Sequence, residues 1–167
     1  MLSILLFCEG SEAVAAPKLA RALSALVPGV VRGLIGDVHL LTPPGAIFAS
    51  IADEAGVRHR VNAADGSGFG QSLAALKGPW CLAMAGDQRA DGALFDALEA
   101  FMAGPQRAAL LGSAPQNLAH RLLPAFAPAS GLLWHGVKLA TPLPSSWSAL
   151  RAALRPRLTL PARTCPM

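Results

Sequence analysis

The run Pro79–Asp87, PWCLAMAGD, constrains the fold more than any other part of the chain. Its apolar residues end at Ala85, Gly86 and Asp87, and a helical pattern from Asp91 to Met102 follows. A short, continuous apolar run bounded by turn residues is typical of a strand buried on both faces, as in a parallel sheet covered by helices. Open sheets of this kind bind ligands at the carboxyl ends of their strands. We therefore expect an α/β protein with a candidate site near Asp87.

Strand-like and helical segments alternate along the rest of the chain. Strands are predicted at Leu2–Phe7, Val38–Leu41, Val57–Val61, Trp80–Ala85, Ala108–Leu111 and Gly131–Trp134. Helices are predicted from a Ser11 cap to Leu26, where Pro28-Gly29 stops the helix, and at Ala46–Ala55, Gln71–Lys77, Asp91–Met102, Gln116–Leu123 and from Ser145 or Ser146 to Leu154. The tail from Pro156 is expected to be extended. This order predicts a mostly parallel sheet, and a length of 167 residues suits a single domain, 1–167.

Composition limits the possible partners. The chain is 53% hydrophobic and only 14% charged, which indicates either a homo-oligomer or another partner that buries apolar surface, or merely an alanine-rich composition. The formal charge is +4, but no Lys/Arg cluster and no Tyr occur, so a nucleic-acid partner is not expected.

Cysteine usage and hydropathy bear on the compartment. Cys8, Cys81 and Cys165 form no CxxC pair, which argues against a zinc or redox site and suits a reducing cytoplasm. The apolar start, Met1–Phe7, is too short for a signal peptide and is interpreted as the first strand. Since no apolar run approaches about 18 residues, no transmembrane segment is expected.

Few motifs carry recognisable chemistry. Two carboxylates at i and i+2 after the strand ending at Ala85 would suit a divalent metal, because hard cations prefer oxygen ligands. Here Ala85 replaces the first acid, and Asp87 is either a weak metal ligand or a cap of the turn. The glycine-rich stretch Asp65–Gly70, DGSGFG, is either a phosphate-binding loop or a flexible turn before a short helix. The scattered histidines have no ligand spacing, and no GxSxG motif occurs.

Four local matches over roughly residues 2–135 resemble one family. They are Ser11-Glu12-Ala13 after the first strand, Ile51–Gly56, Gly78–Ala83 and Asp96–Phe101. In this order they resemble the bacterial family 2 glycosyltransferases, which have a GT-A fold. The resemblance implies a GT-A-like, Rossmann-type mixed sheet flanked by helices. It also implies a nucleotide-diphosphate sugar as ligand, with Mg²⁺ or Mn²⁺ as cofactor.

The resemblance carries over to few site residues. It implies nucleotide-binding roles for Glu12, Thr42, Gly68 and Gly86, and a metal-binding role for Asp87. Where the family has an acidic turn of the DGSTD kind, this chain has Thr42–Ala46, TPPGA, without a carboxylate. The DxD motif is reduced to Ala85-Gly86-Asp87, and no catalytic base is identified after Met102.

Three functions remain open at this point. The first is a family 2-like glycosyltransferase, possible only if another carboxylate, such as Glu12, Asp65 or Asp91, lies near Asp87. The second is a non-catalytic binding or interaction module on a degenerate GT-A scaffold. The third is a nucleotidyltransferase-like enzyme, which would need a basic, glycine-rich loop after the first strand. Cys8-Glu9-Gly10 is neither long nor basic enough for that loop.

Overall fold

Four parallel strands form one half of the sheet. In the computed structural model these are β1 (Leu2–Phe7), β2 (Ile35–Thr42), β3 (Arg58–Val61) and β4 (Trp80–Ala85), in the spatial order β3-β2-β1-β4. The structure describes residues 1–63, 67–105, 107–113, 129–136, 144–154, 156 and 159–166. The chain leaves β1 toward β2 on one side and later enters β4 on the other, so a topological switch point lies between β1 and β4.

The other half of the sheet is mixed. It contains β5 (Gln88–Arg89), β6 (Ala108–Ser113), β7 (Ala129–His135) and β8 (Thr159–Pro166). β7 is antiparallel to β4 and β6, while β8 runs parallel to β6 and antiparallel to β5. The full order is β3-β2-β1-β4-β7-β6-β8-β5. This arrangement confirms the predicted α/β fold with a mixed sheet.

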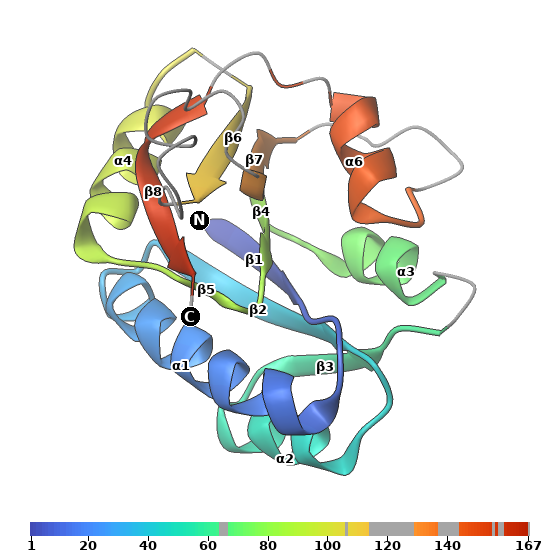
Figure 1. Ribbon diagram of the computed structural model, residues 1–167. Coiled ribbons are helices and arrows are strands. Elements are labelled where there is room, and N and C mark those ends of the chain that lie inside the picture. The colour runs from blue at the N-terminus through green and yellow to red at the C-terminus, as the bar shows by residue number, and fades with distance from the viewer. Residues whose placement is uncertain are drawn as a thin grey trace, which may run out of the picture.

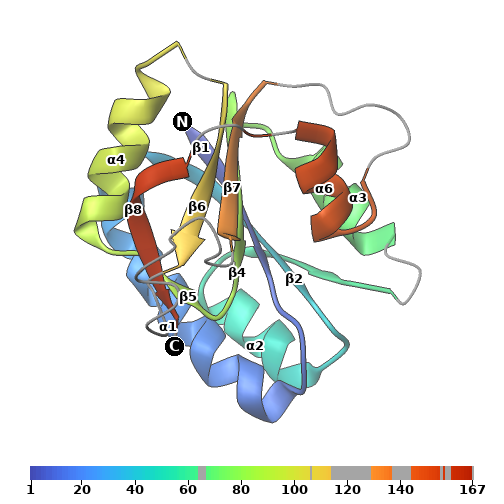
Figure 2. The same ribbon diagram turned by 45° about the horizontal axis from the view of Figure 1, so that its top comes forward.

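Helices cover both faces of the sheet. Helices α1 (Glu12–Val31), α2 (Ala46–Glu54) and α4 (Gly92–Met102) lie on one face, and α3 (Ser67–Ala75) and α6 (Trp147–Leu154) lie on the other (Figures 1 and 2). Strand β1 contributes side chains to the hydrophobic cores on both faces of the sheet, because successive side chains of a strand point to opposite faces. Ile4 and Leu6 belong to the core under α1, α2 and α4, whereas Leu5 belongs to the core under α3 and α6.

The first helix is longer than predicted. The prediction that Pro28-Gly29 ends it is wrong, because α1 continues to Val31. Pro28 lacks only one N–H and lies in the last turns, so it removes a single hydrogen bond. The packing of this end of α1 compensates for the lost hydrogen bond. Leu26 is buried, and a Cβ on Gly29 would lie 2.6 Å from Ile35 Cδ1. The glycine therefore lets the helix end approach β2 closely.

Two other segments also differ from the sequence prediction. Ser67–Gly70, expected to be a loop, forms the first turn of α3, where Phe69 is buried. The tail, expected to be merely extended, supplies β8 to the sheet. The helix predicted at Gln116–Leu123 lies outside the described residues, as do residues 64–66.

Candidate functional site

A cavity of about 160 Å³ lies at the switch point. Phe7 and Ala85, the last residues of β1 and β4, are register partners there, and Gly86 N donates to Phe7 O over 2.8 Å. The first turns of α1 close the other side. The lining residues are Phe7, Cys8, Glu9, Val14, Ala15, Lys18, Ala85, Gly86 and Asp87. The cavity therefore opens at the edge where open α/β sheets bind ligands.

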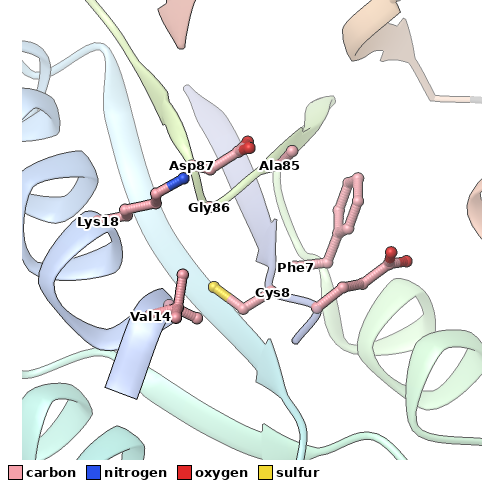
Figure 3. A pocket seen from close by; sticks show the side chains of 9 residues that line it. Phe7, Cys8, Val14, Lys18, Ala85, Gly86 and Asp87 are labelled. Carbon is pink, nitrogen blue, oxygen red and sulfur yellow. The ribbon is translucent and has the colours of Figure 1, made fainter. Parts of the chain in front are cut away.

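Cys8 and Gly86 both line this cavity (Figure 3). A Cβ on Gly86 would overlap Cys8 Sγ, so a side chain at this position requires the thiol to move. Burial raises the pKa of the Cys8 thiol to about 12, with a further contribution from the Asp87 carboxylate. The thiol therefore stays protonated near neutral pH and is not a nucleophile.

Lys18 and Asp87 are two charged residues of the cavity lining, one from α1 and one from the turn after β4. The Lys18 side chain reaches toward the turn that carries Asp87, whereas the Asp87 carboxylate points away from α1 (Figure 3). Asp87 Oδ1 also accepts a hydrogen bond from Gln88 Nε2 over 3.0 Å. Sequence reasoning missed Lys18 as a site residue. The signal was its spacing from Val14 and Ala15, which places the three residues on one side of a helix that begins just after β1.

The other predicted acids are engaged elsewhere. Glu12 Oε1 accepts from Ile47 N at the start of α2, where Gly45 at the N-cap has no side chain to do so. Asp91 Oδ1 caps α4 by accepting from Leu94 N over 2.8 Å. Asp65 lies outside the described residues.

The described residues do not fit a divalent metal. Within that part of the chain, no group of three His, Cys, Asp or Glu side chains converges. A hard cation prefers several oxygen ligands, and Asp87 alone supplies too few of them. The role of Asp87 as a metal ligand therefore stays a prediction.

Thr42 and Gly68 lie away from the cavity lining. Thr42 Oγ1 donates to Pro43 O over 2.8 Å and lies 2.9 Å from His59 Nε2, whose pKa is lowered by burial. A Cβ on Gly68 would lie 2.7 Å from Val61 O, so this glycine lets α3 pack closely on the end of β3. Of the four predicted nucleotide-binding residues, Gly86 lines the cavity.

An aromatic group lies on the opposite side of β1. The ring of Phe7 lies 5.2 Å from that of Trp147 and 6.2 Å from that of Phe69. Trp147 comes from α6, far along the chain, and nothing in the local sequence indicates this contact. Together the rings cover the carboxyl end of β1 on the α3 and α6 face.

Comparison with known proteins identifies the fold. No protein-family model and no curated sequence matches the chain. Glucosyl-3-phosphoglycerate synthase from Mycobacterium tuberculosis, solved with Mn²⁺, UDP and phosphoglyceric acid, matches with a TM-score of 0.58 at 17% identity. That match covers 81% of this chain and 55% of the enzyme. The mannosyltransferase PcManGT from Pyrobaculum calidifontis, solved with GDP-Man and Mn²⁺, matches with a TM-score of 0.58 at 12% identity, over 80% of this chain and 44% of its own.

A third structure aligns with the whole of this chain. 4-Diphosphocytidyl-2C-methyl-D-erythritol synthase from Anaerococcus prevotii matches with a TM-score of 0.61 at 11% identity. The match covers all of this chain and 87% of the other protein's chain. The fold is therefore that of GT-A-like nucleotide-diphospho-sugar transferases and nucleotidyltransferases. The chain spans only about half the length of the two glycosyltransferases it matches.

Proposed function

We propose that the cavity between β1 and β4 binds the diphosphate of a nucleotide, as carried by a nucleotide-diphosphate sugar. The observation that carries this proposal is the Lys18 ammonium, which points into a cavity at the switch point of a GT-A-like sheet. A diphosphate requires positive charge close to its oxygens. Because the lining also contains the Glu9 and Asp87 carboxylates, Lys18 is the charged side chain of the lining that can bind the phosphates directly.

The start of α1 adds to this electrostatic environment. α1 has 20 residues, and its N-cap, Ser11, makes no side-chain capping bond. Long helices carry a partial positive charge at their N-termini, and uncapped N–H groups there bind phosphate oxygens. Glu12 lies in this first turn, but its carboxylate binds the α2 backbone instead. The end of α1 is thus left available to an anion.

Binding is better supported than transfer. Metal-assisted transfer needs a second carboxylate close to Asp87, and the two described candidates for it, Glu12 and Asp91, are both engaged at helix N-termini. This observation favours the second candidate, a binding module on a GT-A-like scaffold that retains the donor pocket. The donor would be held by the cavity while hexosyl transfer is lost. Cys8 and Cys81 are free thiols, and we propose a cytoplasmic location on that basis.

Calorimetry with UDP and GDP, each with and without Mn²⁺, tests the proposal. We expect micromolar binding of at least one nucleotide that persists without the metal. Lys18→Ala should weaken this binding about tenfold or more, because it removes the charge that faces the phosphates. Lys77→Ala is the matched control, since Lys77 lies at the amino end of β4.

The outcomes separate the alternatives. Absence of heat with both nucleotides would overturn the proposal of a diphosphate site. Binding that appears only with Mn²⁺ and is insensitive to Lys18→Ala would mean that a metal, and not Lys18, neutralises the diphosphate. Hydrolysis or transfer of a bound nucleotide sugar, followed by product analysis, would favour the enzyme over the binding module.

A further inference from the structure

The outer side of α1 carries exposed valines that no described segment of the chain covers. Val27, Val30 and Val31 are 54%, 50% and 81% exposed. α1 is even long and apolar enough to cross a membrane by length and composition, with a hydropathy of 1.4 over its best window. Its inner side packs against the sheet, as in the core helix of an α/β protein. Exposed apolar side chains gathered on one side of a helix are typical of an interaction surface, so this side of α1 is a candidate for contact with a partner.

Small residues form the crest of this surface. Ala20 and Ser24 are exposed one turn apart, and Val31 continues the same side two turns later. We call these three residues the α1 ridge. Small side chains at i and i+4 let the backbone of a second helix approach closely.

Hollows of opposite character flank the α1 ridge. On the α2 side lies an apolar groove of about 430 Å³, whose lining includes Leu23, Val27, Ile51 and, as its charged residue, Glu54. On the β5 side lies a second hollow, lined by Ala20, Arg21, Ser24, Ala25 and Arg89. Helix α2 and strand β5 accordingly lie on opposite sides of α1 (Figure 1).

The charges at this surface are self-complementary. Asp53 and Glu54 are exposed on the α2 side, whereas Arg21 and Arg89 are exposed on the β5 side. Neither arginine forms an ion pair within the described part of the chain, where the pairs are Arg32–Asp96 and Asp37–His39. An anionic membrane surface would meet the two carboxylates as well as the arginines, and repulsion would oppose it. A second copy of the chain presents both charges in the same pattern.

We propose that two copies of this chain associate through the α1 ridge, with their α1 helices parallel. A two-fold axis along α1 places the Glu54 side of each copy on the Arg21 and Arg89 side of the other. An axis across α1 would place like charges together. The two ridges then meet at Ala20 and Ser24, and the valines bury their exposed surface in the facing copy. This inference is independent of nucleotide binding.

Sedimentation and light scattering of the purified protein test the association. We expect a species of twice the 17.2 kDa chain mass for the wild type. Ser24→Arg places a long charged side chain on the α1 ridge and should give a monomer. Ala74→Arg on α3, also an exposed helical position but on the opposite face of the sheet, should leave the dimer intact.

Charge reversal tests the parallel arrangement. Glu54→Arg should raise the dimer dissociation constant about tenfold or more, since it faces arginines of the other copy. Adding Arg21→Glu and Arg89→Glu in the same chain should restore the dimer, because the charges on the α2 side and on the β5 side are then both reversed and attract each other again.

Each contrary outcome overturns a stated part of the proposal. A wild type that stays monomeric up to its solubility limit excludes self-association, and a Ser24→Arg dimer assigns it to another surface. Failure of the triple reversal to restore Glu54→Arg excludes the parallel arrangement. Binding of the monomer to phosphatidylglycerol vesicles, lost in Ser24→Glu, would assign the α1 ridge to a membrane instead.

Discussion

The two ends of the parallel half-sheet use polar side chains in opposite ways. At the amino end, Gly78 N donates to Ser3 Oγ over 2.7 Å, and Ser3 Oγ donates to Asp37 Oδ1. The other Asp37 oxygen lies 2.8 Å from His39 Nε2. At the carboxyl end, Lys18 and Asp87 face a cavity. The polar groups of the amino-end cluster bind one another, whereas Lys18 and Asp87 at the carboxyl end line a cavity.

This difference separates stability from function within one sheet. Ser3 and His39 are buried, so their polar atoms need partners inside the protein. Lys18 is only partly buried and Asp87 is exposed, so both are solvated without a ligand. Substitutions in the amino-end cluster should therefore change the free energy of unfolding, and substitutions of Lys18 and Asp87 should change binding.

The largest effect is expected from Asp37→Ala. It removes the partner of two buried groups, Ser3 Oγ and His39 Nε2, and should lower the free energy of unfolding by about 2 to 4 kcal/mol. Chemical denaturation measures this loss. Asp53→Ala, an exposed acid on α2, should change it by less than about 0.5 kcal/mol. Equal losses for the two variants would contradict a structural role for the amino-end cluster.

Gly86→Ala should have the next largest effect, because it acts on packing at the carboxyl end. The new methyl group overlaps Cys8 Sγ and should cost about 1 to 3 kcal/mol of stability. Adding Cys8→Ala should recover most of that loss by making room. Gly92→Ala is the control, since nothing lies within 4 Å of a Cβ there. Additive losses in the Cys8→Ala, Gly86→Ala double variant would argue against the contact.

Ala85→Asp sharpens the comparison by restoring a second carboxylate at the carboxyl end. We expect Mn²⁺ to bind several-fold to about tenfold more tightly in calorimetry, since a hard cation gains an oxygen ligand. Ala100→Asp, at an exposed position of α4, should leave Mn²⁺ binding unchanged. No gain in Ala85→Asp would mean that Asp87 does not face this position as a metal ligand would.

The smallest effect concerns alkaline pH, where the two ends should behave alike. Burial raises the pKa of Cys8 to about 12 and that of Cys81, near the amino end of β4, to about 11, from 9.0. The folded state therefore holds these protons more tightly, and its stability is retained below pH 9 and falls as the pH rises further. Denaturation at pH 8 and 9.5 should show a smaller fall for Cys8→Ala than for the wild type. An equal fall would mean that Cys8 does not titrate as a buried thiol.

The sequence predicts the central strands better than the elements around them. β1 and β4 match their predictions to the residue, because a strand buried on both faces has a continuous apolar pattern. The end of α1 was predicted wrongly because the cost of Pro28 is smaller than the gain from burying Leu26 and Gly29 against the sheet. Likewise, Gly68 suggested a loop but serves a close contact between α3 and β3.

The candidate site was predictable in position but not in composition. The run into Ala85-Gly86-Asp87 locates the carboxyl edge, and Gly86 lines the cavity there. Glu12 lies next to that edge in sequence, but its side chain binds α2, a contact that depends on where β2 ends. Trp147 reaches Phe7 only because α6 packs over β1, and no local pattern contains that information.

The pairing of β5 with β8 also has a consequence for the order of folding. Gln88 pairs with Pro166, so the strand directly after Asp87 finds its partner only after most of the chain has been placed. Contacts of such long sequence separation form late, because closing a long loop costs entropy. During synthesis, β1 and α1 can associate long before this pairing is possible. Lys18 is thus positioned early, whereas the strand that directly follows Asp87 is paired only when residues 159–166 complete the sheet.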